Sequence, residues 1–251
     1  ANILLNKNKS LQVLFEIEKL KSKPLSEKKD FFAKTLQSKV HFSVKEAIVN
    51  QLKNEKSEDQ VPLLILALET KNIQVRQAVS ATITAISEDF RPQYETLLKD
   101  KSYQTQEIAL YHLWNNFPQN RTQYLDQSRN WIGFNDYNLR TMWLSLALST
   151  PDYPIDKESL INELIQYSSV NYEATTRQNA LEKLIGFQLI NDAVLKNLVK
   201  ATTHHMWQFS KFGRDNIRKL LKSPEMRTSF ERILLDLNEG ERFQLNRLLK
   251  E

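Results

Sequence analysis

Arginine is the residue type whose spacing in this sequence most suggests chemistry. Four arginines stand at a similar place in successive apolar helical stretches, so stacked helices would bring them into one row. Such a row could bind carboxylates, because a guanidinium donates paired hydrogen bonds. We favour a structural ladder, in which each arginine pairs with the adjacent repeat, since structural ion pairs are common. The four candidates are Arg76, Arg140, Arg177 and Arg214.

Histidine, cysteine and glycine offer little further chemistry. The four histidines are His41, His112, His204 and His205, and none begins an HExxH zinc motif. The last two are adjacent, so they point to different helix faces and are expected to be structural. The sequence has no cysteine and only four glycines, which excludes thiol catalysis and glycine-rich phosphate loops. We therefore predict no catalytic residue, no metal site and no cofactor in this chain.

The four tryptophans follow the helical apolar pattern and are expected to pack in the core. They are Trp114, Trp131, Trp143 and Trp207. Trp143 lies in an apolar stripe with Leu139 and Leu146, which is typical of a buried helix face. Trp131 differs, because it stands in an aromatic link over residues 130–136 that also contains a glycine. Packing between repeats is the role we expect for this link.

The net charge of +5 is concentrated in one segment. Residues 1–56 hold 12 lysines and 6 acidic residues, whereas residues 57–251 hold 23 basic and 24 acidic residues. Binding to nucleic acid needs several phosphate contacts, so this balance predicts no nucleic-acid partner. No apolar run approaches 18 residues, so no transmembrane helix is expected. The sequence starts at Ala1 without a leader or Met, and we expect a domain cut from a longer protein.

Apolar residues recur at three- and four-residue spacing along nearly the whole chain, which predicts helices. Capping boxes are predicted at Ser43–Glu46 and Ser57–Gln60, and Asn72 is expected to cap another helix. A leading helix near 9–21 is followed by predicted helix pairs. The pairs cover residues 26–54, 59–86, 90–116, 121–149, 156–187, 191–223 and 225–251.

A short element recurs in the second helix of each pair and precedes an apolar stripe each time. It falls at Lys45, Arg76, Gln106, Arg140, Arg177 and Arg214, with steps of 31, 30, 34, 37 and 37 residues. A drifting period of this size is typical of a helical-hairpin solenoid. We therefore predict an all-α fold: one domain over 1–251 that forms a right-handed α-solenoid of about seven HEAT/armadillo-like hairpins.

Several short stretches resemble the C-terminal HEAT-like helical domain of bacterial aminopeptidase N-type zinc metallopeptidases, peptidase family M-one. The stretches include residues 75–79, 109–118, 131–136, 144–153, 177–180 and 203–207, and the resemblance covers most of residues 40–225. It implies a non-catalytic domain that packs on the catalytic domain of the same polypeptide and shapes its peptide-substrate cavity. The zinc and its ligands would then lie in the parent catalytic domain, and the parent would be an exported or periplasmic bacterial enzyme.

Two alternatives stay open. A free-standing HEAT-repeat scaffold that binds a protein partner fits the repeat pattern equally well, because a fold does not set a function. A HEAT-like DNA glycosylase would need a carboxylate between aromatic residues, and Asp136 near Trp131 and Trp143 could take that place. The near-neutral charge of residues 57–251 ranks the glycosylase last.

Overall fold

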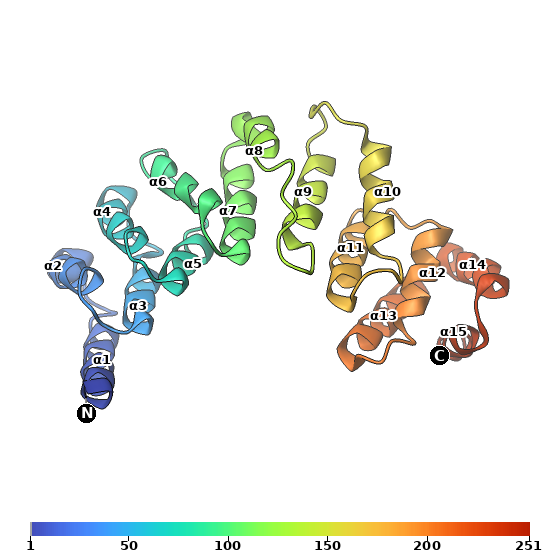
Figure 1. Ribbon diagram of the computed structural model, residues 1–251, viewed down its shortest axis with the longest axis horizontal. Helices are drawn as coiled ribbons and strands as arrows, with labels where there is room; N and C mark the ends of the chain where they lie inside the picture. The colour runs from blue at the N-terminus through green and yellow to red at the C-terminus, as the bar shows by residue number, and fades with distance from the viewer. Residues whose placement is uncertain (1) are drawn as a thin grey trace. The chain divides into compact units, whose positions relative to one another are not determined.

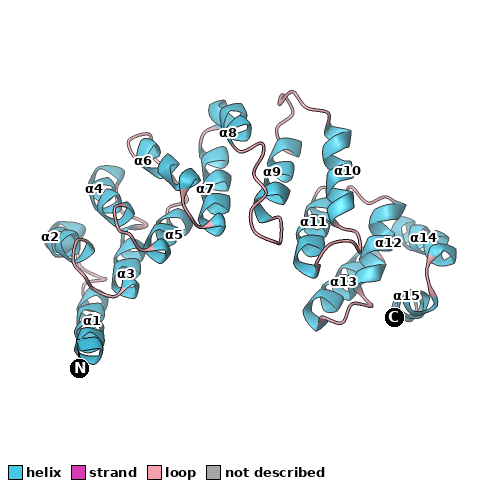
Figure 2. Ribbon diagram, in the orientation of Figure 1, coloured by secondary structure: helices cyan, strands magenta, loops and turns pink. Residues whose placement is uncertain are grey.

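The computed structural model describes residues 2–251, with side chains from residue 8 onward. Over these residues the chain forms fifteen α-helices and three short 3-10 helices, and no strand occurs in this part of the chain (Figure 2). The predicted all-α fold class is therefore confirmed. The chain divides into two compact units, residues 1–124 and 125–251, and each is described by itself.

The first unit consists of helix pairs in two layers. α3, α5 and α7 pack one against the next, and α1 packs on α3 (Figure 1). α2 and α4 pack on each other and on α3 and α5. Each of the predicted pairs at 26–54, 59–86 and 90–116 corresponds to two consecutive helical segments of the structure. The helices are α1 (Asn2–Lys19), α2 (Leu25–Leu36), α3 (Phe42–Leu52), α4 (Ser57–Leu68), α5 (Ile73–Thr82), α6 (Arg91–Glu95), η1 (Thr96–Lys99), α7 (Tyr103–Asn116) and η2 (Pro118–Asn120).

The second unit repeats this arrangement. α9, α11, α13 and α15 pack in sequence as one layer, α10 and α12 cover them, and α14 packs on α12. The predicted pairs at 156–187, 191–223 and 225–251 match α10 to α15 closely. The helices are α8 (Arg121–Gln127), within which the division between the units falls, α9 (Asn138–Leu148), α10 (Lys157–Tyr167), α11 (Ala174–Gly186), α12 (Asp192–Ala201), α13 (Trp207–Leu220), α14 (Pro224–Ile233), η3 (Leu234–Asp236) and α15 (Glu239–Leu249).

The core of each unit is built from the apolar stripes that the sequence predicts. Trp143 is completely buried, and its indole N–H donates to the carbonyl of Leu125 at 2.8 Å, which satisfies its polar atom. Trp114 is also buried. Trp207 contradicts the packing prediction, because 66% of it is exposed at the first residue of α13. The first turn of this helix lies at the surface, so the periodic pattern there does not indicate burial.

One of the three predicted helix caps is correct. The Asn72 side chain accepts from the backbone N–H groups of Gln74 and Val75 and begins α5. The box at Ser43 is wrong, because α3 begins one residue earlier and His41 is its cap. The box at Ser57 is wrong as well, since α4 already includes Ser57 and its hydroxyl instead bonds that of Ser87. A serine already inside the helix cannot cap its first turn.

The aromatic link before α9 is held in a fixed turn. Gly133 has φ +96°, and the side-chain oxygen of Asn138 accepts from the backbone N–H of Phe134. The carbonyls of Asn135 and Asp136 accept hydrogen bonds from α11, which fixes the link against the next hairpin. The Asp136 carboxylate itself accepts from the backbone N–H of Asn138. These hydrogen bonds join the link to the next hairpin, but the predicted packing is wrong for Phe134, which is 64% exposed.

Candidate functional site

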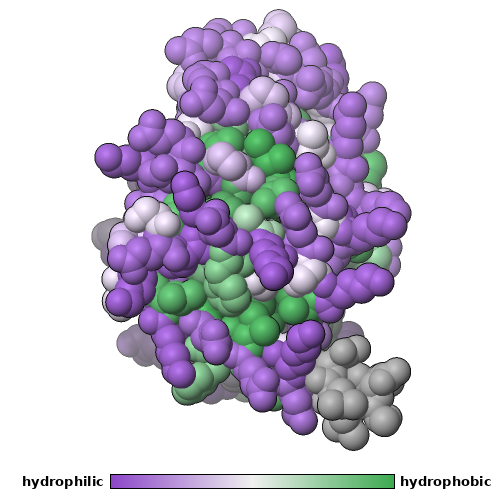
Figure 3. Space-filling view, turned by 90° about the vertical axis from the view of Figure 1, so that its left-hand side faces the viewer, coloured by the Kyte–Doolittle hydropathy of each residue, from purple (hydrophilic) through white to green (hydrophobic). Residues whose placement is uncertain are grey.

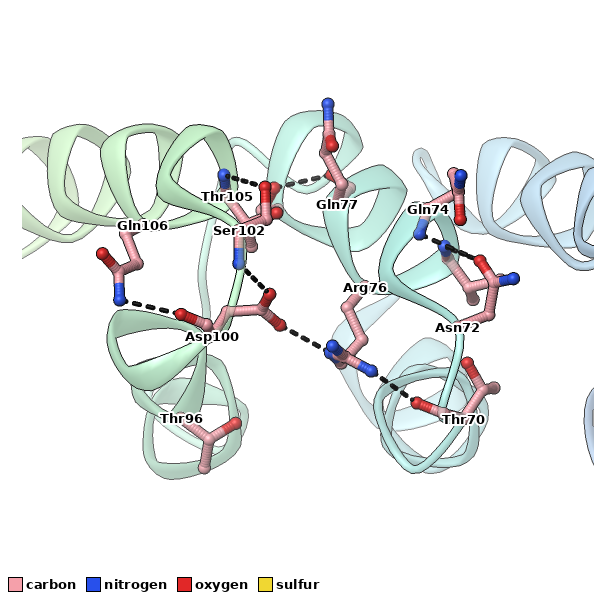
Figure 4. A network of polar contacts seen from close by, with 12 residues as sticks. Thr70, Asn72, Gln74, Arg76, Gln77, Thr96, Asp100, Ser102, Thr105 and Gln106 are labelled. Carbon is pink, nitrogen blue, oxygen red and sulfur yellow. Dashed lines mark hydrogen bonds and ion pairs between the residues drawn. The ribbon is translucent and has the colours of Figure 1, made fainter. Parts of the chain in front are cut away.

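Arg76 shows what an arginine at the repeating position does in the first unit. It is the fourth residue of α5, and its Nε donates to Asp100 Oδ2 at 2.5 Å (Figure 4). Its Nη1 donates to the carbonyl of Thr70 at 2.9 Å, in the link that precedes α5. Asp100 follows η1 in the next hairpin, and its side chain is 2% exposed. The arginine therefore joins its own hairpin to the following one.

Arg140 makes the same pair of contacts in the second unit. Its Nε and Nη2 donate to the two carboxylate oxygens of Glu163 on α10, at 2.5 and 2.7 Å. Its Nη1 donates to the carbonyl of Arg129 in the link before α9, at 2.6 Å. We call this arrangement a rung: one arginine, one carbonyl of the preceding link and one carboxylate of the next hairpin. Arg76 and Arg140 each form a complete rung, as a structural ladder requires.

The Arg140 rung shifts the pKa values of both partners. Its hydrogen bonds to Glu163 raise the pKa of Arg140 further above its ordinary value. Burial by itself would raise the pKa of Glu163, but the hydrogen bonds and charge of Arg140 outweigh burial. The hydroxyl of Tyr167 also donates to Glu163, at 2.9 Å. The pKa of Glu163 therefore lies below its ordinary value, and the carboxylate stays charged.

Gln106 and Arg214 differ from this pattern. Gln106, the fourth residue of α7, keeps the carbonyl contact alone and donates to Asp100 O at 2.8 Å. Arg214 is out of register, because it is the eighth residue of α13 rather than the fourth. The fourth residue is Ser210, and Arg214 donates to its hydroxyl within the same helix. The last step of 37 residues is thus one turn too long, and the ladder role predicted for Arg214 is not what its contacts show.

Arg177 occupies the correct position of α11 but forms no rung. The residue is 4% exposed, and its Nε and Nη2 have no hydrogen-bond partner among the described residues. Its guanidinium lies over the ring of Phe209, with 4.9 Å from Cζ to the ring centroid. Burial lowers the pKa of Arg177. The ladder prediction is therefore wrong for this arginine, and the reason lies in the next helix.

The next helix lacks the acid that a rung needs. Glu163 stands four residues before the end of α10, and the matching residue of α12 is Asn197. The amide of Asn197 donates to Ser168 Oγ at 2.8 Å. The only acid of α12 is Asp192, at its start, which pairs with Arg232. No carboxylate of α12 is therefore placed to meet Arg177.

A polar pocket borders this arginine, although its Nε and Nη2 have almost no solvent-accessible surface. Its volume is about 370 Å³, and α11, the end of α12, the loop after α12 and the start of α15 line it. Besides Arg177 it is lined by Lys200, His204, His205 and Glu241. Glu241 is engaged elsewhere: it completes the capping box of α15 with Asn238 and lies 3.9 Å from Lys200 Nζ. Two cations, Arg177 and Lys200, and one carboxylate, Glu241, line the pocket.

His41 and His112 take structural places, whereas the predicted helix position of His204 and His205 is wrong, because both lie in the loop between α12 and α13. His41 caps α3, and His112 contacts the carbonyl of Ser80 and the hydroxyl of Tyr94. His204 and His205 stack on each other at the rim of the pocket around Arg177. Burial, His205 and Arg177 together lower the pKa of His204. Within the described residues, no three His, Asp or Glu side chains gather as a metal site would require.

The start of the first unit exposes apolar side chains. Leu11 and Phe15, four residues apart on α1, are 62% and 65% exposed. One shallow hollow borders both residues, and a second, which shares Glu16 and Lys19 with the first, extends to Leu20 and Phe31. Figure 3 views the end of the molecule that carries these helices and shows apolar surface between charged side chains. We call Leu11, Phe15, Leu20 and Phe31 the apolar end face.

Comparison of the sequence with protein-family models and with curated proteins found no match. In the described part of the chain, no helix is both long enough and apolar enough to cross a bilayer.

A difference between two helices in the sequence could have revealed the pocket: α12 carries Asn197 and Lys200 where α10 carries Glu163 and Gln166. If each arginine pairs with an acid of the next hairpin, the acid should recur along the sequence with the arginine. A hairpin without that acid then marks an arginine that lacks its partner.

Proposed function

We propose that this chain is the non-catalytic C-terminal helical domain of an aminopeptidase N-type zinc metallopeptidase. In this role it packs on the catalytic domain of the same polypeptide and shapes the cavity that receives peptide substrates. The hairpins would continue through both units as one right-handed α-solenoid of the HEAT/armadillo kind. The zinc of the enzyme belongs to the catalytic domain in this proposal, and no residue of this chain is assigned to it.

The observation that supports an attached domain over a free-standing scaffold is the apolar end face. A repeat array that ends in water needs terminal helices with a polar outer side. The side chains of Leu11 and Phe15 are instead about two-thirds exposed on the first helix. Fully burying such side chains stabilises a contact by roughly 1.5–3 kcal/mol each. A neighbouring domain that covers this face would recover that free energy, and the sequence resemblance suggests which domain it is.

The test compares the isolated chain with the polypeptide encoded by the complete reading frame. We expect that frame to contain an HExxH zinc domain and its product to release amino acids from peptides. In the complete protein, the amides of α1 should exchange with deuterium more slowly than in the isolated chain. The double variant Leu11→Asp, Phe15→Asp should remove this difference, whereas Leu235→Asp should not, because Leu235 is 89% exposed in the other unit.

Two results would contradict the proposal. One is a reading frame without a peptidase domain, which would favour the free-standing scaffold. The other is equal deuterium exchange of α1 in the complete protein and in the isolated chain, since the apolar end face would then be uncovered in both.

A further inference from the structure

We propose that a pocket beside Lys45 binds a small oxyanion, a carboxylate or a phosphate, at the ammonium of this lysine. The pocket lies between the link from α2 to α3 and the link from α4 to α5, and its volume is about 430 Å³. It belongs to the first unit alone, and the proposal does not depend on the parent enzyme suggested above. The ligand takes the place of the carboxylate that completes a rung elsewhere in the chain.

The first argument is the position of Lys45 in the repeat. It is the fourth residue of α3, as Arg76 is of α5. The acid in line to complete its rung is Glu69, which follows it by 24 residues. Asp100 follows Arg76 by the same number, and each acid comes directly after the first helical segments of its hairpin. Among the described residues, however, Lys45 has no ion pair and no hydrogen bond, so this rung is open.

The second argument is the cost of leaving this charge without a partner. Lys45 is half-buried, and burial lowers the pKa of its ammonium. No carboxylate offsets this effect, whereas at Arg140 the hydrogen bonds to Glu163 outweigh burial. A lysine also ends in one compact charge and lacks the fork with which an arginine reaches a carboxylate. An anion that enters the pocket would therefore stabilise a cation that has lost part of its hydration.

The third argument is the lining of the pocket. Lys39 and Lys71 lie on the two links that border it, and neither has an ion pair among the described residues. With Glu69 as the one acid in the lining, the three lysines leave a net charge of +2. Asn72 can donate but not accept, because its side-chain oxygen is engaged by the backbone of α5 (Figure 4). The lining thus favours an anion by charge, and the volume exceeds the space for a single water.

The experiment follows the backbone amide resonances of the whole chain by NMR while inorganic phosphate or succinate replaces chloride at constant ionic strength. We expect the amides of Lys39 and Lys71 to shift and to saturate. Lys45→Met should weaken binding by about tenfold or more, because it removes a charge-assisted hydrogen bond. The matched control is Lys29→Met, which removes the same charge from an exposed position of α2 outside the pocket and should leave the affinity unchanged.

A second variant tests the sign of the ligand charge. Glu69→Gln removes the one acid of the lining, so the affinity for either probe should rise several-fold. Saturation by succinate alone identifies a carboxylate site, and saturation by phosphate alone identifies a phosphate site; both support the proposal. The titration of the unmodified chain does not depend on the folding of any variant. The proposal is overturned if neither probe gives a saturable shift, if Lys45→Met binds as tightly as the unmodified chain, or if Glu69→Gln binds more weakly.

Discussion

Removing Arg140 tests whether a rung stabilises the stack of hairpins. The variant is Arg140→Met, which keeps an unbranched aliphatic stem but removes three hydrogen bonds and the guanidinium that lies over the ring of Trp143. Glu163 would keep only the hydroxyl of Tyr167 among these partners. Breaking a buried ion pair costs about 3–5 kcal/mol, whereas exposed pairs contribute about 0–1 kcal/mol. The two side chains are 18% and 25% exposed, so we expect a loss of about 2–3 kcal/mol.

The assay is a double-mutant cycle with Glu163→Gln, read by urea unfolding of all four proteins. We expect a coupling energy of about 1.5–2 kcal/mol, which two charge-assisted hydrogen bonds can supply. At about 4 °C per kcal/mol for a unit of this size, Arg140→Met should melt about 10 °C lower. The matched control is the pair Arg232–Asp192, which has the same two-bond geometry at the surface and should show no measurable coupling. A coupling energy below about 0.5 kcal/mol at Arg140 would refute the ladder, because the rung would then behave as a surface pair.

Three further predictions concern pH, the incomplete rung and the aromatic link. The folded-state pKa of Glu163 lies below its unfolded value, so the charged carboxylate contributes fully to the free energy of unfolding above about pH 5. This contribution is lost as pH falls through the folded pKa. Acid unfolding, followed by circular dichroism, should therefore be steeper in the unmodified chain than in Arg140→Met. Arg177→Met should raise or preserve the melting temperature of the chain, because it removes a buried charge whose Nε and Nη2 have no hydrogen-bond acceptor. A large loss of stability would show that the contact with the Phe209 ring outweighs this cost. Gly133→Ala should lower the free energy of unfolding in urea by about 2–4 kcal/mol, since φ is +96° and the new Cβ would lie 2.1 Å from Asn138 Oδ1. The control is Gly186→Ala, whose new Cβ would have no atom within 4 Å. This control should be neutral or slightly stabilising.

The sequence alone was sufficient to predict the helices and their order. Helix formation depends on the local three- and four-residue spacing of apolar residues and on turn residues, and both are visible in one dimension. The predicted pair at 156–187, for example, became α10 and α11 with ends that differ by one residue. The cap at Asn72 was predictable for the same reason, because a capping side chain and the N–H groups that it accepts from are two or three residues apart. The exact first residues of the helices near Ser43 and Ser57 were not predictable, since several nearby residues can serve as a cap.

Which arginines pair, and which one remains free, depended on the tertiary structure. Arg76, Arg140 and Arg177 look alike in the sequence. The partners of Arg76 and Arg140 lie 24 and 23 residues away in the next hairpin, and a pairing at that distance depends on how the hairpins stack. The position of α12 that matches Glu163 of α10 holds Asn197, and Nε and Nη2 of Arg177 have no acceptor among the described residues. Burial of the guanidinium and the closing of a pocket by α15 are likewise consequences of packing. Local spacing therefore determined the helices and the repeating position of the arginines. Contacts between distant segments decided which partner each arginine has.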